Sequence, residues 1–155
     1  MLKIEIPGRK ILNIENIIFD FNGTLALDGK LNDNTKTLLN KLKELVNIYI
    51  LTADTYGTVL EQCKDLGFQV KIFSQKSSSL CKKKIVKSIK GDKIAVGNGF
   101  NDIEMFKVSE LSIAIIGKEG CCSKLLKYCD IVVTSIEDVF DLFFNPSRIK
   151  ATLRS

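Results

Sequence analysis

A carboxylate, an amide, a glycine and a hydroxyl follow an apolar run near the start of the chain. Residues 17–19 read Ile-Ile-Phe, and Asp20, Asn22, Gly23 and Thr24 come next, interrupted by one phenylalanine. An aspartate can attack phosphorus, a glycine lets the backbone approach a phosphate closely, and a threonine can donate to its oxygens. A strand that ends in an Asx-type turn accounts for the same residues. Partners elsewhere in the chain must decide between these two interpretations.

Two further apolar runs end in polar groups of the same kind. Residues 48–51 are followed by Thr52, Ala53 and Asp54, and residues 94–96 by Gly-Asn-Gly-Phe-Asn-Asp. The amide and carboxylate oxygens of the last segment can ligate a hard cation, and a glycine-rich turn with a helix cap is the competing interpretation. Because ligands of open α/β sheets bind at the carboxyl ends of the strands, we expect all three segments to share one rim.

Strand and helix patterns alternate along the chain, which predicts a parallel sheet covered by helices on both faces. We expect strands at residues 2–6, 17–21, 48–51, 70–73, 94–96, 111–116 and 131–133, and helices at about residues 33–46, 56–66, 78–90, 123–128 and 136–144. Asp28-Gly29 between short apolar segments predicts a small hairpin. The basic tail of residues 147–155 is expected on the surface or against a neighbour.

Size and composition fit one globular domain of residues 1–155. The hydrophobic content is 45% and the charged content 26%, values typical of soluble proteins. No apolar run approaches the roughly 18 residues of a membrane span. The first residues lack the apolar centre of a signal peptide, and five cysteines without zinc-finger spacing fit a reducing compartment. We therefore expect a cytoplasmic protein with no membrane partner.

The net charge of +5 comes from lysines spread along the sequence, with one cluster at residues 82–84. Such a balance favours anionic ligands in general. Nucleic acid is not expected as a partner, because basic and aromatic residues do not interleave and no helix-turn-helix or RNA-binding signature is present.

Together the motifs resemble those of the haloacid dehalogenase (HAD) superfamily of phosphohydrolases, and within it the soluble P-type-ATPase-like proteins that lack a membrane region. The resemblance covers nearly the whole chain. It rests on residues 20–24 (DFNGT), residues 51–54 (LTAD), a lysine that opens a helix, and residues 97–102 (GNGFND), in the family's order. It implies a three-layer α/β/α Rossmann-like fold with a mainly parallel sheet. Where many relatives insert a cap domain, this chain has room only for a small β-hairpin flap.

The resemblance implies a Mg²⁺-dependent phosphohydrolase that forms an aspartyl-phosphate on Asp20. Magnesium would be held by Asp20, the backbone carbonyl of Asn22 and the side chain of Asn98. Thr52 would donate its hydroxyl to a phosphoryl oxygen. Asp102 would position either the catalytic lysine or a water on the metal, and so completes the expected metal site.

The phosphate would be bound by Gly23, Thr24, Thr52, Ala53 and a lysine that balances its charge. Three consecutive lysines could be this residue.

By its spacing to the following Ile-Val pair, Lys82 best matches the position of the lysine in the family that the chain resembles, whereas Lys83 or Lys84 would point elsewhere on a helix.

The chain departs from the superfamily's pattern at two positions. Asn22 stands where most phosphatases of the superfamily have an aspartate that acts as general acid and base, and an amide cannot take that proton. Losing such a group typically costs about 100- to 10,000-fold in rate, so we expect slow turnover or a long-lived aspartyl-phosphate. Asn98 also replaces an aspartate, and its neutral oxygen should bind magnesium more weakly.

Two other functions compete with a slow phosphatase. One is a phosphate- or magnesium-binding regulatory module with reduced catalysis, and the other is a soluble ATP hydrolase. The expected partner is a phosphorylated substrate, which the sequence leaves open as a small molecule, a nucleotide or a macromolecule. A second subunit of a homo-oligomer could complete the open site.

Overall fold

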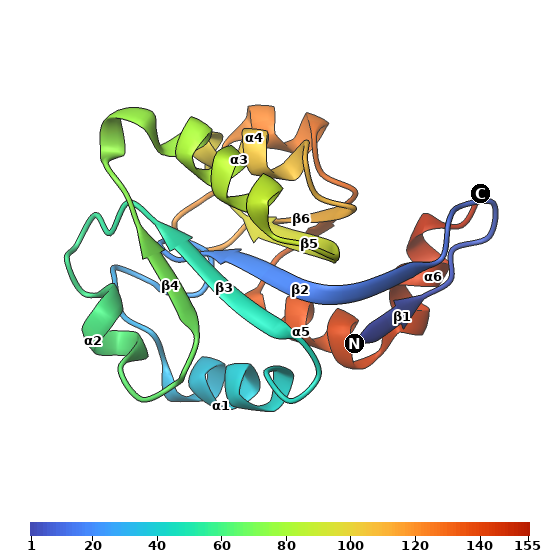
Figure 1. Cartoon of the computed structure of the whole chain (residues 1–155), viewed down its shortest axis with the longest axis horizontal. Coiled ribbons are helices and arrows are strands. Elements are labelled where there is room, and N and C mark those ends of the chain that lie inside the picture. The colour runs from blue at the N-terminus through green and yellow to red at the C-terminus, as the bar shows by residue number, and fades with distance from the viewer.

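The fold is built around the long central strand β2 of a seven-stranded sheet, shown in Figure 1. The computed structural model describes all residues, 1–155. The strands are β1 (Leu2–Ile4), β2 (Leu12–Asp20), β3 (Asn47–Thr52), β4 (Gln69–Ile72), β5 (Asp92–Gly97), β6 (Leu111–Ile115) and β7 (Ile131–Val133). Strands in the order β4-β3-β2-β5-β6-β7 are parallel to their neighbours, and β1 pairs antiparallel with β2. The expected α/β fold with a mainly parallel sheet is confirmed.

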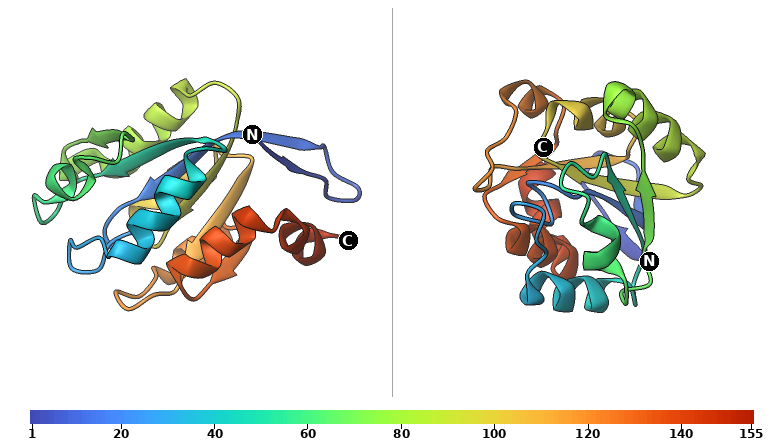
Figure 2. Two further views of the ribbon diagram at one scale, coloured as in Figure 1. Left: turned by 90° about the horizontal axis from the view of Figure 1, so that it is seen from below. Right: turned by 90° about the vertical axis from the view of Figure 1, so that its left-hand side faces the viewer.

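Helices cover both faces of the sheet, with α1 and α5 on one side and α3 and α4 on the other (Figures 1 and 2). The α-helices are α1 (Asp33–Leu42), α2 (Val59–Cys63), α3 (Ser78–Ser88), α4 (Ile103–Phe106), α5 (Ile136–Phe144) and α6 (Pro146–Leu153). Short 3₁₀ helices are η1 (Gln75–Ser77), η2 (Phe100–Asp102) and η3 (Ser123–Lys127). None of these helices combines the length and the apolar character needed to cross a membrane.

The alternation of side chains along β2 determines which face each residue serves. Ile17 and Phe19 face α1 and α5, where the Phe19 ring packs 5.9 Å from the ring of Phe140 between centroids. Ile18 belongs to the smaller core cluster on the side of α3 and α4. Asp20 has the same parity as Ile18, so the strand delivers its carboxylate to the α3 side of the sheet rim.

Several expected elements have different bounds in the structure; for example, β1 ends at Ile4 rather than residue 6, and α1 at Leu42 rather than residue 46. Strand β2 begins at Leu12 rather than residue 17, because its first residues pair with β1. Helix α2 covers only Val59–Cys63, since residues before it form a turn in which Gly57 has φ +66°. The segment of residues 123–128 is mostly the 3₁₀ helix η3.

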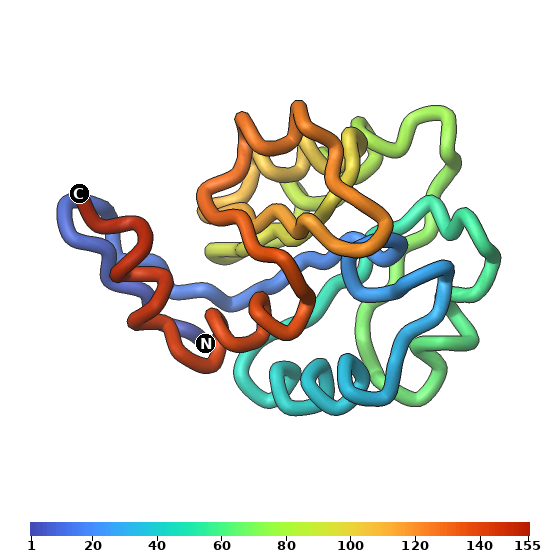
Figure 3. The backbone as a smooth tube through the Cα atoms, turned by 180° about the vertical axis from the view of Figure 1, so that it is seen from behind, coloured from blue at the N-terminus to red at the C-terminus, as the bar shows by residue number.

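The C-terminal tail, which the sequence placed on the surface or against a neighbour, forms helix α6. Pro146 stands at its first turn, a position that tolerates the missing backbone N–H. Its Ile149 side chain is 1% exposed, and α6 lies beside β1 and the N-terminal part of the chain, as the view from behind in Figure 3 shows. The apolar side chain thus docks the tail on its own chain.

The flap after β2 is a two-residue hairpin, as expected. Leu27 and Lys30 exchange backbone hydrogen bonds of 3.1 and 3.0 Å. Asp28 and Gly29 both have positive φ, 51° and 74°, as a type I′ turn requires. The Thr58 hydroxyl donates to the Gly29 carbonyl at 2.7 Å, which fastens the flap to the loop before α2.

Candidate active site

Three adjacent strands bring the polar motifs to one rim of the sheet. Asp20 ends β2, Thr52 ends β3, and Asn98 follows the last residue of β5. Because β3 and β5 are the two parallel neighbours of β2, these three strand ends lie next to one another.

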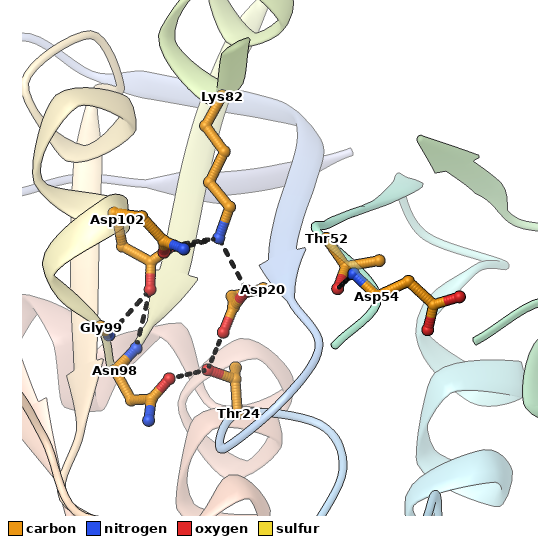
Figure 4. Close-up of polar contacts among 9 residues, drawn as sticks. Asp20, Thr24, Thr52, Asp54, Lys82, Asn98, Gly99 and Asp102 are labelled. Atoms are coloured by element: carbon orange, nitrogen blue, oxygen red, sulfur yellow. Dashed lines mark hydrogen bonds and ion pairs between the residues drawn. The ribbon is translucent and has the colours of Figure 1, made fainter. Parts of the chain in front are cut away.

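The core of the site is a buried ion cluster centred on Lys82, shown in Figure 4. Lys82 Nζ lies 2.7 Å from Asp20 Oδ1 and 2.5 Å from Asp102 Oδ1. It also donates to Asn101 Oδ1 at 3.1 Å. Lys82 and Asp102 are fully buried, and Asp20 is 7% exposed. Residues from β2, α3 and η2, far apart in the sequence, therefore form one hydrogen-bonded group.

Helix geometry selects one lysine from the run of three. Lys82 and Val86 are the buried residues of α3, and their i, i+4 spacing places both on the face that meets the sheet. Lys83 instead pairs with Glu104 at 2.5 Å, and Lys84 is exposed. Of the three lysines, Lys82 is the one that the structure pairs with Asp20.

The cluster holds two carboxylates against one ammonium group, so it has one net negative charge when all three are ionised. Burial, followed by the charge of Asp102, raises the pKa of Asp20 to about 6, against the opposing effect of Lys82. Burial alone would lower the pKa of Lys82, but the charges of Asp102 and Asp20 outweigh it and raise this pKa. A cation bound beside Asp20 would therefore balance the net negative charge of the cluster.

Thr24 links the nucleophile candidate to Asn98. Its hydroxyl oxygen lies 3.3 Å from Asp20 Oδ2 and 3.3 Å from Asn98 Oδ1. Gly23 has φ +78°, and a Cβ added to it would lie 2.3 Å from Asn98 Nδ2. A side chain at Gly23 would therefore displace the Asn98 amide as well as strain the turn.

Asp102 organises the loop between β5 and η2. Its Oδ2 accepts from the backbone N–H groups of Asn98 at 3.1 Å and Gly99 at 2.9 Å, while Oδ1 faces Lys82. A Cβ on Gly97 would lie 2.4 Å from Asp102 Oδ2, so this glycine leaves room for the carboxylate. Both Asp102 oxygens are occupied, which favours its role of orienting Lys82 over that of a metal ligand.

Thr52 and its neighbours stand apart from the ion cluster. The buried Thr52 hydroxyl accepts from the Asp54 backbone N–H at 2.9 Å, which leaves its hydrogen free to be donated. Figure 4 shows Thr52 on the other side of Asp20 from Asp102, with the Asp54 carboxylate directed away. Asp54 Oδ1 accepts from the first N–H groups of the α2 turn, on Thr58 and Val59, so this residue caps the helix. Ala53 lies between Thr52 and Asp54 and makes no side-chain hydrogen bond.

The donor atoms around Asp20 fit a hard divalent cation. Asp20 Oδ2 and Asn98 Oδ1 converge on the Thr24 hydroxyl, and the third oxygen expected there is the backbone carbonyl of Asn22, whose side-chain oxygen is buried without a hydrogen-bond partner. All three are oxygen donors, the type that Mg²⁺ prefers. Groups of three or more His, Cys, Asp or Glu side chains suited to a metal are absent, in keeping with the two asparagines of this set.

One contributor to the site was missed by sequence reasoning. Asn101 accepts from Lys82, yet the motif analysis assigned it no role. Its place one residue before Asp102 was the available signal. Cys121 and Cys122 lie in the loop next to Asn98, where the Cys122 N–H donates to the Asn98 carbonyl at 2.8 Å, and all five cysteines are free.

Proteins of Methanocaldococcus jannaschii are similar to this chain in sequence. The uncharacterised protein MJ0073 is 42% identical over 83 residues, which cover 50% of this chain and 89% of that protein. A soluble P-type ATPase-like phosphatase is 23% identical over 144 residues, 90% of this chain but only 53% of that protein. No family model matches the sequence.

Solved structures of phosphatases share the fold. The cobalt-bound deoxy-D-mannose-octulosonate 8-phosphate phosphatase of Haemophilus influenzae has a TM-score of 0.71 at 12% identity, covering 92% of this chain and 94% of that one. The corresponding enzyme of Moraxella catarrhalis, crystallised with magnesium, phosphate and KDO, has a TM-score of 0.68 at 17% identity, covering 91% and 94%. The chain therefore belongs to one family with MJ0073, and it shares its fold with these phosphatases and with a putative HAD family hydrolase of Streptomyces avermitilis, at a TM-score of 0.69 and 17% identity over 86% of this chain and 87% of that one.

Proposed function

We propose that the chain is a magnesium-dependent phosphohydrolase that works through an aspartyl-phosphate on Asp20. The observation that carries this proposal is the buried cluster of Asp20, Lys82 and Asp102, which keeps one net negative charge beside the oxygens of Asn98 and Thr24. A buried charge without a partner is costly, so a merely structural cluster would not be expected to retain it. The likeness to phosphatases in sequence and fold supports the same conclusion.

Each residue of the cluster has a role in such a reaction. A carboxylate oxygen of Asp20 attacks phosphorus, and the bond from phosphorus to the leaving oxygen breaks. Lys82 balances the charge of Asp20 and the phosphoryl group, and Asp102 holds the lysine in place. Thr52 donates its free hydrogen to a phosphoryl oxygen. Backbone groups of Gly23 and Ala53 lie at the two strand ends where that group would bind.

The Asp20 carboxylate, the Asn98 side chain and the backbone carbonyl of Asn22 would hold the magnesium ion. When bound, Mg²⁺ neutralises phosphate charge and aligns the displacement. The Thr24 hydroxyl lies between two of these oxygens, one on Asp20 and one on Asn98, and can donate its single hydrogen to either. Because Asn98 is neutral, we expect weaker affinity than an aspartate would give.

With Asn22 in place of a carboxylate, the first step depends on how easily the leaving group departs without a proton. The second step depends on attack by water that no side chain at this position deprotonates. An amide cannot protonate a leaving oxygen, and it cannot take a proton from the water that later attacks phosphorus. Phosphates whose leaving groups depart without protonation, such as aryl and acyl phosphates, should therefore react best. The aspartyl-phosphate should then persist longer than in enzymes with a second carboxylate.

A cleft beside the flap gives room for a small leaving group. Its volume is about 610 Å³, and its lining includes Gly23, Thr24 and the flap, so it adjoins the loop that follows Asp20 at the end of β2. Such a volume is typical of small-molecule sites. Buried Leu31 and Ile115 line it, and Lys30 is exposed at its edge. We therefore infer a phosphorylated small molecule as the substrate class.

Phosphate release from a panel of phosphoesters tests the proposal. The panel should include p-nitrophenyl phosphate, acetyl phosphate, sugar phosphates, ATP and a phosphopeptide, each with Mg²⁺ and with EDTA. We expect Mg²⁺-dependent release from small phosphates that is abolished by Asp20→Asn and unchanged by Asp65→Asn, an exposed aspartate away from the site. Release that survives Asp20→Asn would contradict the proposed nucleophile. Binding of Mg²⁺ and phosphate without turnover would instead favour a regulatory module. Faster phosphate release from ATP than from the other phosphates would favour an ATP hydrolase.

A further inference from the structure

Every polar group of Asn98 has a partner. Its backbone N–H donates to Asp102 at 3.1 Å, and its carbonyl accepts from the Cys122 N–H at 2.8 Å. On the side chain, Oδ1 lies 3.3 Å from the Thr24 hydroxyl, and Nδ2 donates to the Gly120 carbonyl at 3.1 Å. Two of these four contacts come from one loop, residues 117–122.

The Gly120 carbonyl determines which way the Asn98 amide faces. A carbonyl oxygen only accepts hydrogen bonds, so it selects the NH₂ end of the amide. The amide oxygen must then point to the opposite side, where Thr24 and Asp20 lie. Reversal of the amide would place oxygen against oxygen at Gly120 and would present NH₂ to a cation. An asparagine, unlike an aspartate, needs such a selection to act as a metal ligand.

Hydrogen bonds also hold the first part of the loop of residues 117–122 in place. A tight turn brings the Gly120 N–H to the Gly117 carbonyl at 3.0 Å, and Gly120 has φ +79°. Within this turn, Glu119 Oε2 accepts from the Asp28 backbone N–H at the tip of the flap, at 3.2 Å. The flap, the turn and the Asn98 amide thus form one chain of contacts.

We propose that the loop of residues 117–122 is a positioning element that directs the Asn98 amide oxygen towards Asp20. Gly120 acts through its carbonyl, and Glu119 acts by tying the turn to the flap. Neither residue contacts the reacting groups, so both are positioning residues. The inference rests on the proposed function to the extent that Asn98 is taken as a metal ligand.

Binding of Mn²⁺, an oxygen-preferring substitute for Mg²⁺, provides a test that needs no turnover. Free Mn²⁺ is followed by electron paramagnetic resonance during titration of the whole protein. Gly120→Ala strains the turn through its positive φ although nothing lies within 4 Å of the added Cβ. We expect the dissociation constant to rise about fivefold, the equivalent of one net hydrogen bond. Gly67→Ala is the matched control, because Gly67 also has positive φ and open space, at φ +71°.

Variants of Glu119 separate positioning from a general loss of stability. Glu119→Ala removes the acceptor for the Asp28 N–H and should weaken Mn²⁺ binding, whereas Glu119→Gln keeps an accepting oxygen and should restore most of it. Equal affinities for Gly120→Ala, Gly67→Ala and the wild type would overturn the inference, as would a failure of Glu119→Gln to differ from Glu119→Ala.

Asn98→Ala distinguishes this inference from the proposed function. If Asn98→Ala weakens Mn²⁺ binding and the loop variants do not, the ligand assignment stands and the positioning role is refuted. If Asn98→Ala has no effect on Mn²⁺ binding, the metal site of the proposed function is wrong, and the positioning role is overturned with it.

Discussion

Replacement of Lys82 by methionine removes the only cation between two buried carboxylates. The ammonium group lies 2.7 Å from Asp20 and 2.5 Å from Asp102, and its side chain is fully buried. Methionine fills similar space but leaves both carboxylates without a counter-charge. Removing one partner of a buried ion pair typically costs about 3–5 kcal/mol, a large share of the roughly 5–15 kcal/mol that stabilises a domain.

The assay is urea unfolding followed by circular dichroism at pH 7.5 in EDTA, with the free energy extrapolated to water. Lys84→Met is the matched control, since Lys84 is exposed on the same helix and should cost less than about 0.5 kcal/mol. We expect Lys82→Met to lose at least about 3 kcal/mol relative to Lys84→Met. A difference below about 1 kcal/mol, within the range for exposed ion pairs, would refute the view that Lys82 holds this cluster together.

Three further outcomes follow from the same structure. Asn22→Asp should speed turnover of phosphate esters by about 100-fold or more, most for alkyl esters that need leaving-group protonation; equal rates in a steady-state assay would mean that Asn22 is not limiting. Gly23→Ala should weaken Mn²⁺ binding, because its Cβ would meet Asn98 Nδ2 at 2.3 Å, whereas Gly57→Ala, also at positive φ but without neighbours, should not. Burial raises the pKa of Cys63 to about 11 from 9.0, so the folded state keeps its proton longer, and stability should fall between pH 9 and 11. Unfolding free energies of Cys63→Ala should fall less over this range than those of the wild type.

The strand that delivers Asp20 could be predicted because both faces of β2 are buried. An uninterrupted apolar run that stops at an aspartate is typical of a central parallel strand with its carboxyl end at a polar rim. The same reasoning located Thr52 and Asn98, each after a shorter run. Side-chain parity along β2 then assigns Asp20 to the face of α3, and helix periodicity assigns Lys82 from its run of three.

Features that depend on distant backbone groups were beyond the reach of the sequence. The orientation of the Asn98 amide depends on a carbonyl at Gly120, 22 residues away, and a glycine carries no side-chain signal for that role. The basic composition of residues 147–155 did not predict where this tail packs. In the structure α6 contacts β1, and Ile149 is its single buried residue. Asp54 resembled a site residue by its position after a strand, yet its carboxylate caps α2.

Detection of a phosphoryl group on Asp20 tests the central proposal most directly. The protein is mixed with acetyl phosphate and Mg²⁺, quenched in acid within seconds, digested and analysed by mass spectrometry. We expect the mass of one phosphoryl group on the peptide that contains Asp20, with a long lifetime because Asn22 cannot activate water, and none in Asp20→Asn. Turnover of acetyl phosphate by a protein that is never phosphorylated at Asp20, or the same adduct in Asp20→Asn, would contradict the proposed mechanism.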